Sequence, residues 1–438
     1  MLSEASESTS LENDRPSHVR YWVVLFAVTL AIITYIDRVA LSQAAGAISK
    51  DLNLDKRQMG WVFFAFISAY ALFEIPSGVM GDTMGPRKVL MRIVIWWSFF
   101  VAATGRAWNF VSLLVIQTLF GVGEAGCFPN IAKAFSVWLP QEERVRAQGI
   151  VWLSARWGGA MTPALVFLIL QKVSWRNAFA IFGVLGVIWA VFFYRWFRDR
   201  PSDNPKVNAG ELRLLPTAVH AHKHGAIPWA KFLNSKQVWL LCGQYFCLSY
   251  SWYFYVTWLP TYMREARHFD PASGGSAVLA GLPLFLGGIG SLFSGFVAKP
   301  LTRLTGSVGK TRRILACTGF VCASALLVIS TLLRDPVTAL VAMSFASFSN
   351  DLAMPGAWGA CMDVGGQYAG TLSGTMNMMG NAGGAIAPVI AGYLLKATGD
   401  DWNLVIYVAA AVYFVGAFFW LALDPVTPLD SHHGLEPR

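Results

Sequence analysis

Runs of about twenty mostly apolar residues recur along the whole chain and are separated by short polar stretches. A helix of ~20 residues is long enough to cross the hydrocarbon core of a bilayer. Twelve runs can be counted, with approximate limits 21–41, 60–80, 89–108, 111–132, 147–170, 177–197, 237–262, 276–298, 314–333, 336–360, 370–395 and 403–423. The pattern predicts an all-α membrane protein with twelve transmembrane helices.

Composition indicates the same class, because 55% of the 438 residues are hydrophobic and only 13% are charged. Soluble domains contain about one quarter charged residues. The first twenty residues carry four acids and no apolar core, so we expect no cleaved secretory signal. The six cysteines lie in or beside predicted spans without the CxxC spacing of metal sites, so we expect them to pack and to bind no metal.

A net charge of +9 is compatible with nucleic-acid binding, but the positions of the charges indicate membrane topology instead. Of the 34 Lys and Arg residues, 22 lie in the tails and even-numbered connections, 10 lie in the odd-numbered connections, and Arg38 and Arg156 lie within spans. Basic connections remain in the cytoplasm. We therefore expect both termini and the long central connection on the cytoplasmic side, and no nucleic-acid partner.

The only long polar connection, near residues 198–236, divides the chain into halves that echo each other. Gly158-Gly-Ala-Met-Thr-Pro163 in the fifth span matches Gly383-Gly-Ala-Ile-Ala-Pro388 in the eleventh, and three further matches follow the same order: Pro129 with Pro355, Trp175 with Trp402, and Gly78 with Gly295. Such repetition predicts two six-helix pseudo-repeats. The expected divisions are an N-terminal tail (1–20), a first half (21–197), a cytoplasmic central loop (198–236), a second half (237–423) and a C-terminal tail (424–438).

The connection between the second and third spans carries a specific motif, Gly78-x-x-x-Asp82-x-x-Gly85-x-Arg87-Lys88. It resembles the signature loop of the major facilitator superfamily. The counterpart in the second half is degenerate, because Gly295 is followed by Lys299 where an acid is expected. The resemblance implies the major facilitator fold, in which Gly78, Asp82, Gly85, Arg87 and Lys88 form a gating latch; ordinary anchoring of basic residues at the cytoplasmic surface is the alternative.

Within that superfamily the chain resembles the anion:cation symporters, which include hexuronate, galactonate and glucarate permeases and relatives of sialin and the vesicular glutamate transporters. The likeness covers about residues 20–424 and is carried by Tyr35-Ile-Asp-Arg38, Tyr70, Ile75-Pro-Ser-Gly78, Gly121-Val-Gly-Glu-Ala-Gly126, Phe128-Pro129, Trp258-Leu-Pro-Thr-Tyr262, Asn350-Asp-Leu-Ala-Met-Pro355 and Gly380-Asn-Ala-Gly-Gly384. One departure concerns Gln117, seven residues before Glu124, where many relatives have Arg. The usual Arg–Glu pair within the fourth span is therefore absent here.

Ionisable residues inside a span are costly and mark functional sites by default. Six lie within or at the ends of predicted spans: Asp37, Arg38, Glu74, Glu124, Arg156 and Asp351. Asp37 and Arg38 are adjacent and point about 100° apart, so they face different neighbours. Arg38 suits a substrate carboxylate while Asp37 titrates; alternatively, both extend to the membrane interface.

Glu124 lies among glycines that bring helices together, which predicts either a proton-coupling site or a structural hydrogen bond. Asp351 is either a further proton site or a partner for backbone groups freed by Pro355. Arg156 either meets the anion or pairs with Glu124, and Glu74 is expected to be mainly structural. The predicted substrate contacts are Arg38, Tyr70, Gln117, Arg156, Tyr250, Tyr253, Asn377 and Asn381, with interhelical packing or hydrogen bonding as the alternative for the tyrosines and asparagines.

Together these residues predict a secondary active transporter that imports an organic anion, expected to be a sugar acid, by alternating access with co-transported protons. Sodium in place of protons stays open, and we expect no bound cofactor, no enzymatic activity and a monomer in the inner membrane of a bacterium. A drug/proton antiporter of the same superfamily and a transporter-like sensor are the alternatives. A histidine cluster, His220-x-His222-x-His224, falls in the central loop without a Cys or acidic neighbour, so we expect no metal there.

Overall fold

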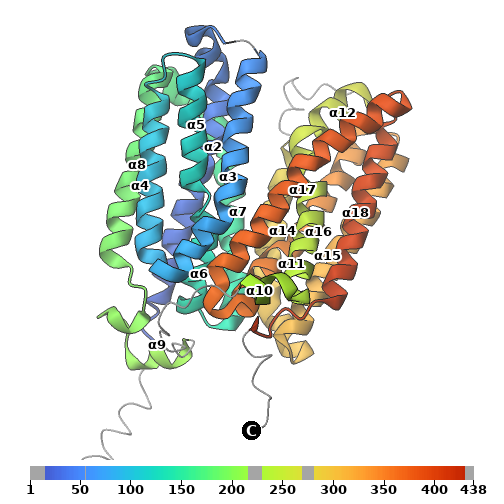
Figure 1. The fold of residues 1–438 in the computed structure, drawn as a ribbon. Coiled ribbons are helices and arrows are strands. Elements are labelled where there is room, and N and C mark those ends of the chain that lie inside the picture. The colour runs from blue at the N-terminus through green and yellow to red at the C-terminus, as the bar shows by residue number, and fades with distance from the viewer. Residues whose placement is uncertain (1–14, 55, 216–228, 269–280, 430–438) are drawn as a thin grey trace, which may run out of the picture.

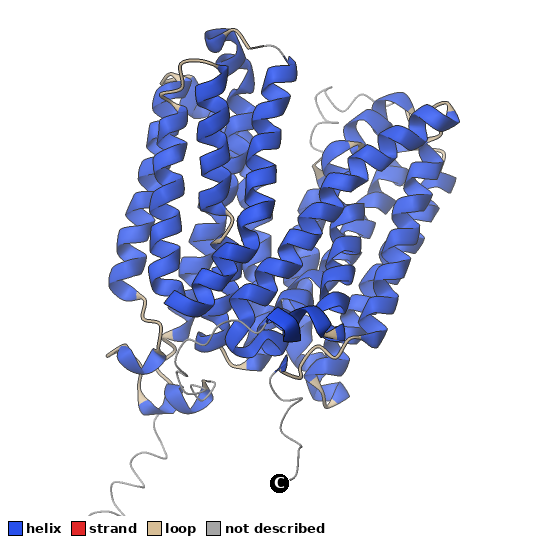
Figure 2. Ribbon diagram, viewed as in Figure 1, coloured by secondary structure: helices blue, strands red, loops and turns tan. Residues whose placement is uncertain are grey.

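A computed structural model describes residues 15–54, 56–215, 229–268 and 281–429, and the described residues form helices joined by loops, without a strand (Figures 1 and 2). The first half contains α2 (Arg20–Leu52), α3 (Lys56–Met84), α4 (Pro86–Thr104), α5 (Phe110–Glu124), α6 (Cys127–Trp138), α7 (Gln141–Leu170) and α8 (Trp175–Trp196). A 3₁₀ turn (Pro201–Asp203), α9 (Ala209–Leu214) and α10 (Trp229–Asn234) follow. The second half contains α11 (Lys236–Thr257), α12 (Leu259–Glu265), α14 (Leu282–Thr305), α15 (Val308–Leu332), α16 (Pro336–Gly365), a 3₁₀ turn (Gly366–Tyr368), α17 (Ala369–Thr398) and α18 (Trp402–Ala422).

The long apolar helices confirm that the chain is a membrane protein, as predicted. Nine helical stretches of the described chain are long and apolar enough to span a bilayer, and one of them, Pro336–Leu395, is 60 residues long and contains both α16 and α17. Helices α4 and α11 run alongside these stretches (Figure 1). With α5 and α6 taken together as one stretch, the described residues thus contain twelve crossing helices, six in each half. The predicted fold of two six-helix halves is confirmed.

Local sequence sets the helix ends. Proline at the first helical position begins α4 and α16, where its missing N–H costs nothing. Polar side chains cap several N-termini through a backbone N–H, as Asn109 does for α5 and Ser174 for α8. Two helices end at a left-handed glycine, Gly306 after α14 and Gly399 after α17. Each of these polar and glycine caps gives a helix-end backbone group a hydrogen-bond partner.

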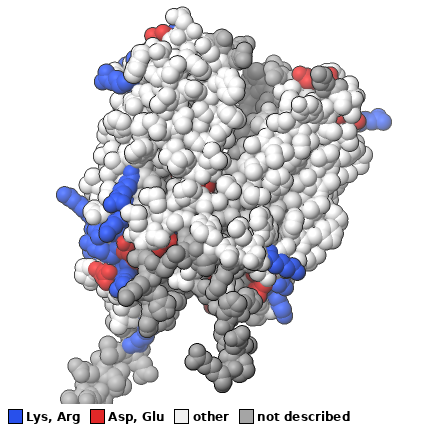
Figure 3. Space-filling view, viewed as in Figure 1, with Lys and Arg blue, Asp and Glu red and all other residues white. Residues whose placement is uncertain are grey.

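The two halves converge at one end of the molecule and diverge at the other (Figure 1). We call the closed end the tail end, because α9, α10 and the residues that follow α18 lie there. The charged side chains on the face drawn in Figure 3 gather toward the two ends, with most Lys and Arg near the tail end and a broad uncharged band between. That distribution suits a bundle whose middle faces lipid.

The internal repeat that the sequence indicates also appears in the packing. A Cβ at Gly158 of α7 would meet the Ile32 backbone of α2, and a Cβ at Gly383 of α17 would meet the Phe246 carbonyl oxygen of α11 at 2.6 Å. The two matching glycine motifs therefore bring α7 against α2 and α17 against α11. The matching tryptophans, Trp175 and Trp402, each begin the last helix of their half.

Two pairs of helices bring the main chains of the two halves together, and we call them the α3–α17 seam and the α7–α14 seam. In the first, a Cβ at Gly78 would lie 2.3 Å from the Gly370 carbonyl oxygen, so the two backbones are in contact. In the second, a Cβ at Gly149 would lie 2.5 Å from the Ser291 carbonyl oxygen, and one at Gly295 would lie 3.0 Å from the Arg146 Cα. Small residues thus allow the main chains of opposite halves to touch.

Candidate substrate and coupling site

A break in the fourth span positions Glu124. Helix α5 ends at this residue, two residues follow in a turn, and α6 begins at Cys127. The sequence prediction treated residues 111–132 as one helix, and Gly126 with Pro129 accounts for the interruption. Interrupted membrane helices often border the binding sites of transporters. The carboxyl group of Glu124 is fully buried.

Arg38 of α2 supplies the partner of Glu124. Its Nε donates to Oε1 of Glu124 at 2.7 Å, and its guanidinium carbon lies 4.3 Å from the ring centroid of Tyr70 on α3. Glu124 therefore pairs with an arginine from a neighbouring helix and not with a residue of its own span. The Arg38 side chain keeps 23% of its surface exposed. One of its terminal nitrogens, Nη2, makes no hydrogen bond to a described residue.

Asp37 makes no ion pair with Arg38, its neighbour in the chain, which agrees with the different directions of adjacent helical residues. It is buried, with the indole of Trp97 beside it and with Glu124 within electrostatic range. Neither carboxyl oxygen makes a hydrogen bond of ordinary geometry to another described residue. A buried carboxyl group without a cationic partner is unstable as an anion. Asp37 is thus suited to carry a proton.

Glu74 lies on the α3–α17 seam. The Asn377 side chain of α17 donates a hydrogen bond of 2.5 Å to Oε1 of Glu74 and lies 3.5 Å from the Tyr70 hydroxyl. The amide of Asn381, one turn further along α17, donates to the Asn377 carbonyl oxygen at 3.0 Å. Asn377 therefore connects the second half to the residues around Arg38, whereas Asn381 bonds within α17.

Arg156 does not pair with Glu124, which corrects one of the two alternatives for this residue. It binds Asp351 of α16, with Nη2 to Oδ1 at 2.8 Å and Nε to Oδ2 at 2.6 Å. Its guanidinium carbon also lies 4.6 Å from the ring centroid of Trp252 on α11. Helix α7 belongs to the first half and α16 to the second. This ion pair therefore joins the halves.

The remaining predicted contacts fall into two groups. Tyr253 of α11 lies within electrostatic range of Arg38, and its ring packs against the backbone of Gly384. Gln117 is buried and donates to the Thr104 hydroxyl at 2.9 Å, within the first half. Tyr250 packs on Phe246 inside the second half. Tyr253 therefore lies toward Arg38, while Gln117 and Tyr250 make these contacts within their own halves.

Below the arginines, toward the tail end, aromatic rings from both halves pack together. Phe128 of α6 stacks on Trp152 of α7 with centroids 4.7 Å apart, and Trp152 lies 5.6 Å from Trp358 of α16. The indole of Trp358 donates to the Tyr245 hydroxyl at 3.1 Å. This aromatic layer separates the charged groups from the tail end.

The signature loop contributes a contact between the halves at the tail end. Asp82 accepts hydrogen bonds from the backbone N–H groups of Gly370 (3.0 Å) and Thr371 (2.6 Å) at the start of α17. A carboxylate is stabilised there by the helix dipole. Lys133 of α6 also binds Asp82, at 3.0 Å. Gly78 and Asp82 therefore take part in the closed tail end.

The other latch residues act within the first half. The Arg87 guanidinium donates to the Tyr194 carbonyl oxygen at 2.7 and 3.1 Å, and the Arg87 backbone N–H donates to Asp199 at 2.8 Å. Gly85 has a φ of 84° at the start of α4, and a Cβ there would collide with the Asp199 carboxyl group. Lys88 is exposed. Burial raises the pKa of the Asp199 carboxyl, although the Arg87 N–H and the nearby cations oppose this rise.

A second contact between the halves was missed by the sequence reasoning. Asp363 near the end of α16 binds both Arg144 of α7 and Arg312 of α15, the latter at 2.7 Å, and accepts a hydrogen bond of 2.7 Å from Gln141. The two arginines entered the charge count only as basic residues of cytoplasmic connections. A usable signal was present, because Asp363 is an isolated acid in an even-numbered connection without Lys or Arg.

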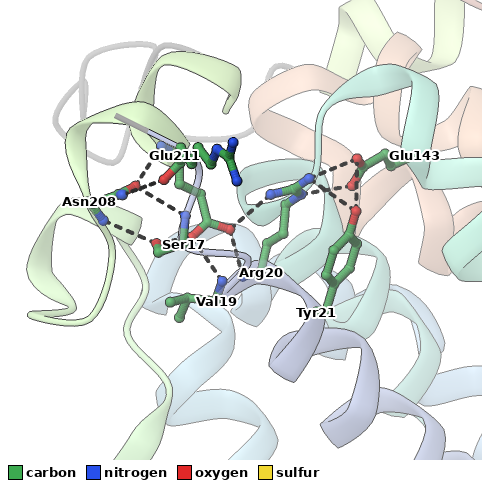
Figure 4. A network of polar contacts seen from close by, with 8 residues as sticks. Ser17, Val19, Arg20, Tyr21, Glu143, Asn208 and Glu211 are labelled. Carbon is green, nitrogen blue, oxygen red and sulfur yellow. Dashed lines mark hydrogen bonds and ion pairs between the residues drawn. The ribbon is translucent and has the colours of Figure 1, made fainter. Parts of the chain in front are cut away.

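The segment before α2 is fastened to α9 by a network that we call the tail-end clasp, formed by Ser17, Arg20, Glu143, Asn208 and Glu211 (Figure 4). Glu211 accepts the backbone N–H groups of Val19 and Arg20 at 2.9 Å each and the Ser17 hydroxyl at 2.5 Å. Arg20 binds Glu143 at the start of α7. Desolvation raises the pKa of the Glu211 carboxyl, but these hydrogen bonds outweigh it and lower that pKa below its ordinary value.

Metal-binding clusters of three or more His, Cys, Asp or Glu side chains do not occur in the described part of the chain. The His220-x-His222-x-His224 cluster lies outside the described residues.

Comparison with known proteins agrees with this architecture. The pattern of the Major Facilitator Superfamily matches residues 27–388. The chain is similar to the probable sulfoacetate transporter SauU of Cupriavidus necator, with 33% identity over 94% of this chain and 95% of the relative. It is also similar to the hexuronate transporter of Bacillus subtilis, with 30% identity over 86% of this chain and 88% of the relative. Among solved structures, the proton:xylose symporter XylE has the same fold, with a TM-score of 0.73 at 12% identity, covering 94% of this chain and 98% of that one.

The fold, the two halves and these matches define a polytopic membrane transporter rather than an enzyme. The chain belongs to the Major Facilitator Superfamily, and its relatives include transporters named for organic anions.

Proposed function

We propose that this chain imports a small organic anion, expected to be a sugar acid, together with protons, by alternating access between its two halves. The observation that carries the proposal is the buried ion pair of Arg38 and Glu124 with the unpartnered carboxyl group of Asp37 beside it. A substrate carboxylate can bind Arg38 once a proton neutralises Glu124, because the guanidinium then needs a new anion. Relatives named for sulfoacetate and hexuronate transport support an acidic substrate.

The energetics favour proton coupling. Importing an anion against an inside-negative potential costs ~2.3 kcal/mol per charge per 100 mV. One proton per anionic charge cancels this cost, and a further proton makes uptake electrogenic and driven by the potential. Asp37, Glu124 and Asp351 are the acids that we propose as proton carriers. Sodium coupling is the alternative outcome of the test below.

We further propose that both termini face the cytoplasm of a bacterial cell and that the protein works as a monomer in the inner membrane. The excess of Lys and Arg in the tails and even-numbered connections supports this orientation. With the tail end in the cytoplasm, the closed seams and the Asp82 and Asp363 contacts belong to a state whose site faces outward. Rocking of the halves then opens these contacts and delivers the substrate inside.

Uptake into proteoliposomes tests the proposal. Purified protein is reconstituted and offered a panel of labelled sugar acids, sulfoacetate, dicarboxylates and phosphate, with pH and potential gradients imposed separately. We expect concentrative uptake of an acidic substrate under an inward proton gradient, persistence when potassium replaces sodium, and loss on adding a protonophore. Uptake that strictly needs sodium and ignores the protonophore contradicts the proton assignment. Absence of uptake for every anion contradicts the proposed substrate class.

A further inference from the structure

The ion pair between Arg156 and Asp351 has features that packing alone does not require. Both side chains are buried, with 5% and 0% of their surface exposed, and two contacts of 2.6 and 2.8 Å join them. Asn350 adds a hydrogen bond of 2.8 Å to Oδ1 of Asp351. Burying an ion pair costs several kcal/mol of desolvation per ion, so a hydrophobic pair of similar size often stabilises a protein as well or better. Stability alone therefore does not explain why this ion pair is buried here.

Polar groups without a partner surround this ion pair. The indole nitrogen of Trp252, whose ring lies under Arg156, makes no hydrogen bond to a described residue, and the same holds for the hydroxyls of Tyr255 and Ser347. A Cβ at Gly287 of α14 would lie 2.8 Å from the Ser347 hydroxyl and 2.9 Å from Oδ2 of Asp351, so α14 closes tightly over these groups. Buried polar groups normally find partners. Here several hydrogen-bond donors without partners lie near one ion pair.

The two arginines border a common region. Tyr253 lies within electrostatic range of Arg38, and its ring is 5.3 Å from that of Trp252, which contacts Arg156. Adjacent residues of α11 therefore connect the two arginines. A ligand held between the two arginines would lie along this part of α11.

Charge balance decides which ligand that is. Each arginine already holds one carboxylate, Glu124 on Arg38 and Asp351 on Arg156. A monoanion needs only Arg38 and leaves the second pair intact. A ligand with two acidic groups can take both arginines, provided that each displaced carboxylate accepts a proton. The titratable groups that face Asp351 are Arg156 from α7, Tyr255 from α11 and Tyr413 from α18, so no second carboxylate competes at this position among the described residues.

We propose that Arg156, with Trp252 and Tyr255, forms a second anion subsite that opens when Asp351 takes up a proton, and that the substrate is a dianion held between Arg38 and Arg156. This inference rests on the proposed function and narrows its substrate class. Because Arg156 and Asp351 belong to opposite halves, exchange of Asp351 for the second acidic group of the substrate also loosens a contact between the halves. Substrate binding and the rocking movement are coupled at this residue.

Matched pairs of ligands test the subsite with full-length protein in nanodiscs. Sulfoacetate is compared with isethionate, and glucarate with gluconate, because each pair differs only in a carboxylate against a hydroxymethyl group. We expect the wild-type protein to bind the dianion at least about tenfold more tightly than its partner, corresponding to ~1.4 kcal/mol. Binding of the dianion should weaken as pH rises, since Asp351 must be protonated.

Two variants separate the subsite from a structural ion pair. The double variant Arg156→Gln with Asp351→Asn removes both charges together, so no unpaired charge stays buried, and it should bring the dianion-to-monoanion affinity ratio toward one. Asp351→Asn alone frees Arg156, so the weakening of dianion binding at higher pH should shrink to that of the monoanion, which Glu124 still sets. The matched control is Arg176→Gln with Asp51→Asn, which deletes a more exposed ion pair of the first half and should leave the ratio unchanged.

Equal affinity for both members of each pair in the wild-type protein overturns the inference, as does a ratio that survives in the double variant. Proton-driven uptake of monoanions alone also overturns it, while the proposed function stands. If neither anion class binds, the proposed function fails together with the subsite.

Discussion

Arg38 and Arg156 each hold one carboxylate, but the first pair lies inside one half and the second joins the two halves. Glu124 and Arg38 both belong to the first half, and the Arg38 side chain is 23% exposed, against 5% for Arg156. A pair within one rigid half can exchange partners by side-chain movement alone. A pair between halves must break whenever they separate. The two arginines are therefore suited to different tasks, substrate capture at Arg38 and control of the movement at Arg156.

The strongest test of this comparison is Arg38→Lys. An ammonium group keeps the charge but does not reproduce the planar contact of a guanidinium with a carboxylate. We expect anion affinity to fall by about 10- to 100-fold, since hydrogen bonds to charged groups contribute ~1.5–3 kcal/mol. Equilibrium binding in detergent measures this loss, and Arg176→Lys, in the more exposed pair with Asp51, is the control. Wild-type affinity in the Arg38 variant would show that this residue anchors the helix and does not bind substrate.

A smaller and more selective effect is expected from Glu124→Gln, which mimics the protonated acid while keeping its size. Exchange of substrate across the membrane should persist, because exchange needs no net release of a proton. Concentrative uptake should fall to the level of equilibration. Counterflow and gradient-driven uptake in the same proteoliposomes distinguish the two, with Asp37→Asn as the parallel variant.

If Glu124→Gln still accumulates substrate at wild-type levels under a pH gradient, Glu124 does not carry the coupling proton. Glu124 would then be structural, and the coupling proton would belong to the pair between the halves at Asp351 or to Glu74.

The smallest effect is expected at the tail-end clasp, away from both pairs. There a third arginine, Arg20, binds Glu211. Because hydrogen bonds lower the pKa of Glu211, this carboxylate stabilises the fold at neutral pH and loses that contribution as pH falls through its lowered pKa. Glu211→Gln should cost about 1 kcal/mol at neutral pH and nothing at strongly acid pH. Thermal unfolding at a series of pH values measures the difference, with the exposed Glu142→Gln as control. A penalty that grows toward acid pH would contradict this assignment.

The sequence predicted the fold well because a bilayer permits few solutions. Twelve apolar runs, the charge asymmetry and the repeated glycine motifs each depend on local composition, and Trp175 and Trp402 begin equivalent helices as expected. The interruption between Glu124 and Cys127 was missed because residues 111–132 remain mostly apolar across it. Hydropathy alone does not register a turn of two residues inside such a run.

The site was only partly predictable for a related reason. Intramembrane charges identified Arg38, Glu124, Arg156 and Asp351, since their burial is costly wherever they lie. Their pairing depends on which helices touch, and no spacing within one helix reports that. Arg156 could be assigned to Glu124 by proximity in sequence, yet Asp351, 195 residues away, is its partner. Asp363 was overlooked for the same reason, because its arginines come from two other helices.

At the α3–α17 seam, closure of the tail end depends on different residues from those that select the ligand. A Cβ at Gly78 would lie 2.3 Å from the Gly370 carbonyl oxygen, and one at Gly374 would lie 2.5 Å from the Glu74 carbonyl oxygen. Closure at this place is encoded by the absence of side chains, whereas ligand choice is encoded by the side chains around the arginines. Residues around the arginines can therefore change to alter specificity while the seam stays the same. A methyl group added at Gly370 would instead collide with the Gly78 carbonyl oxygen and keep the seam apart, whatever the substrate.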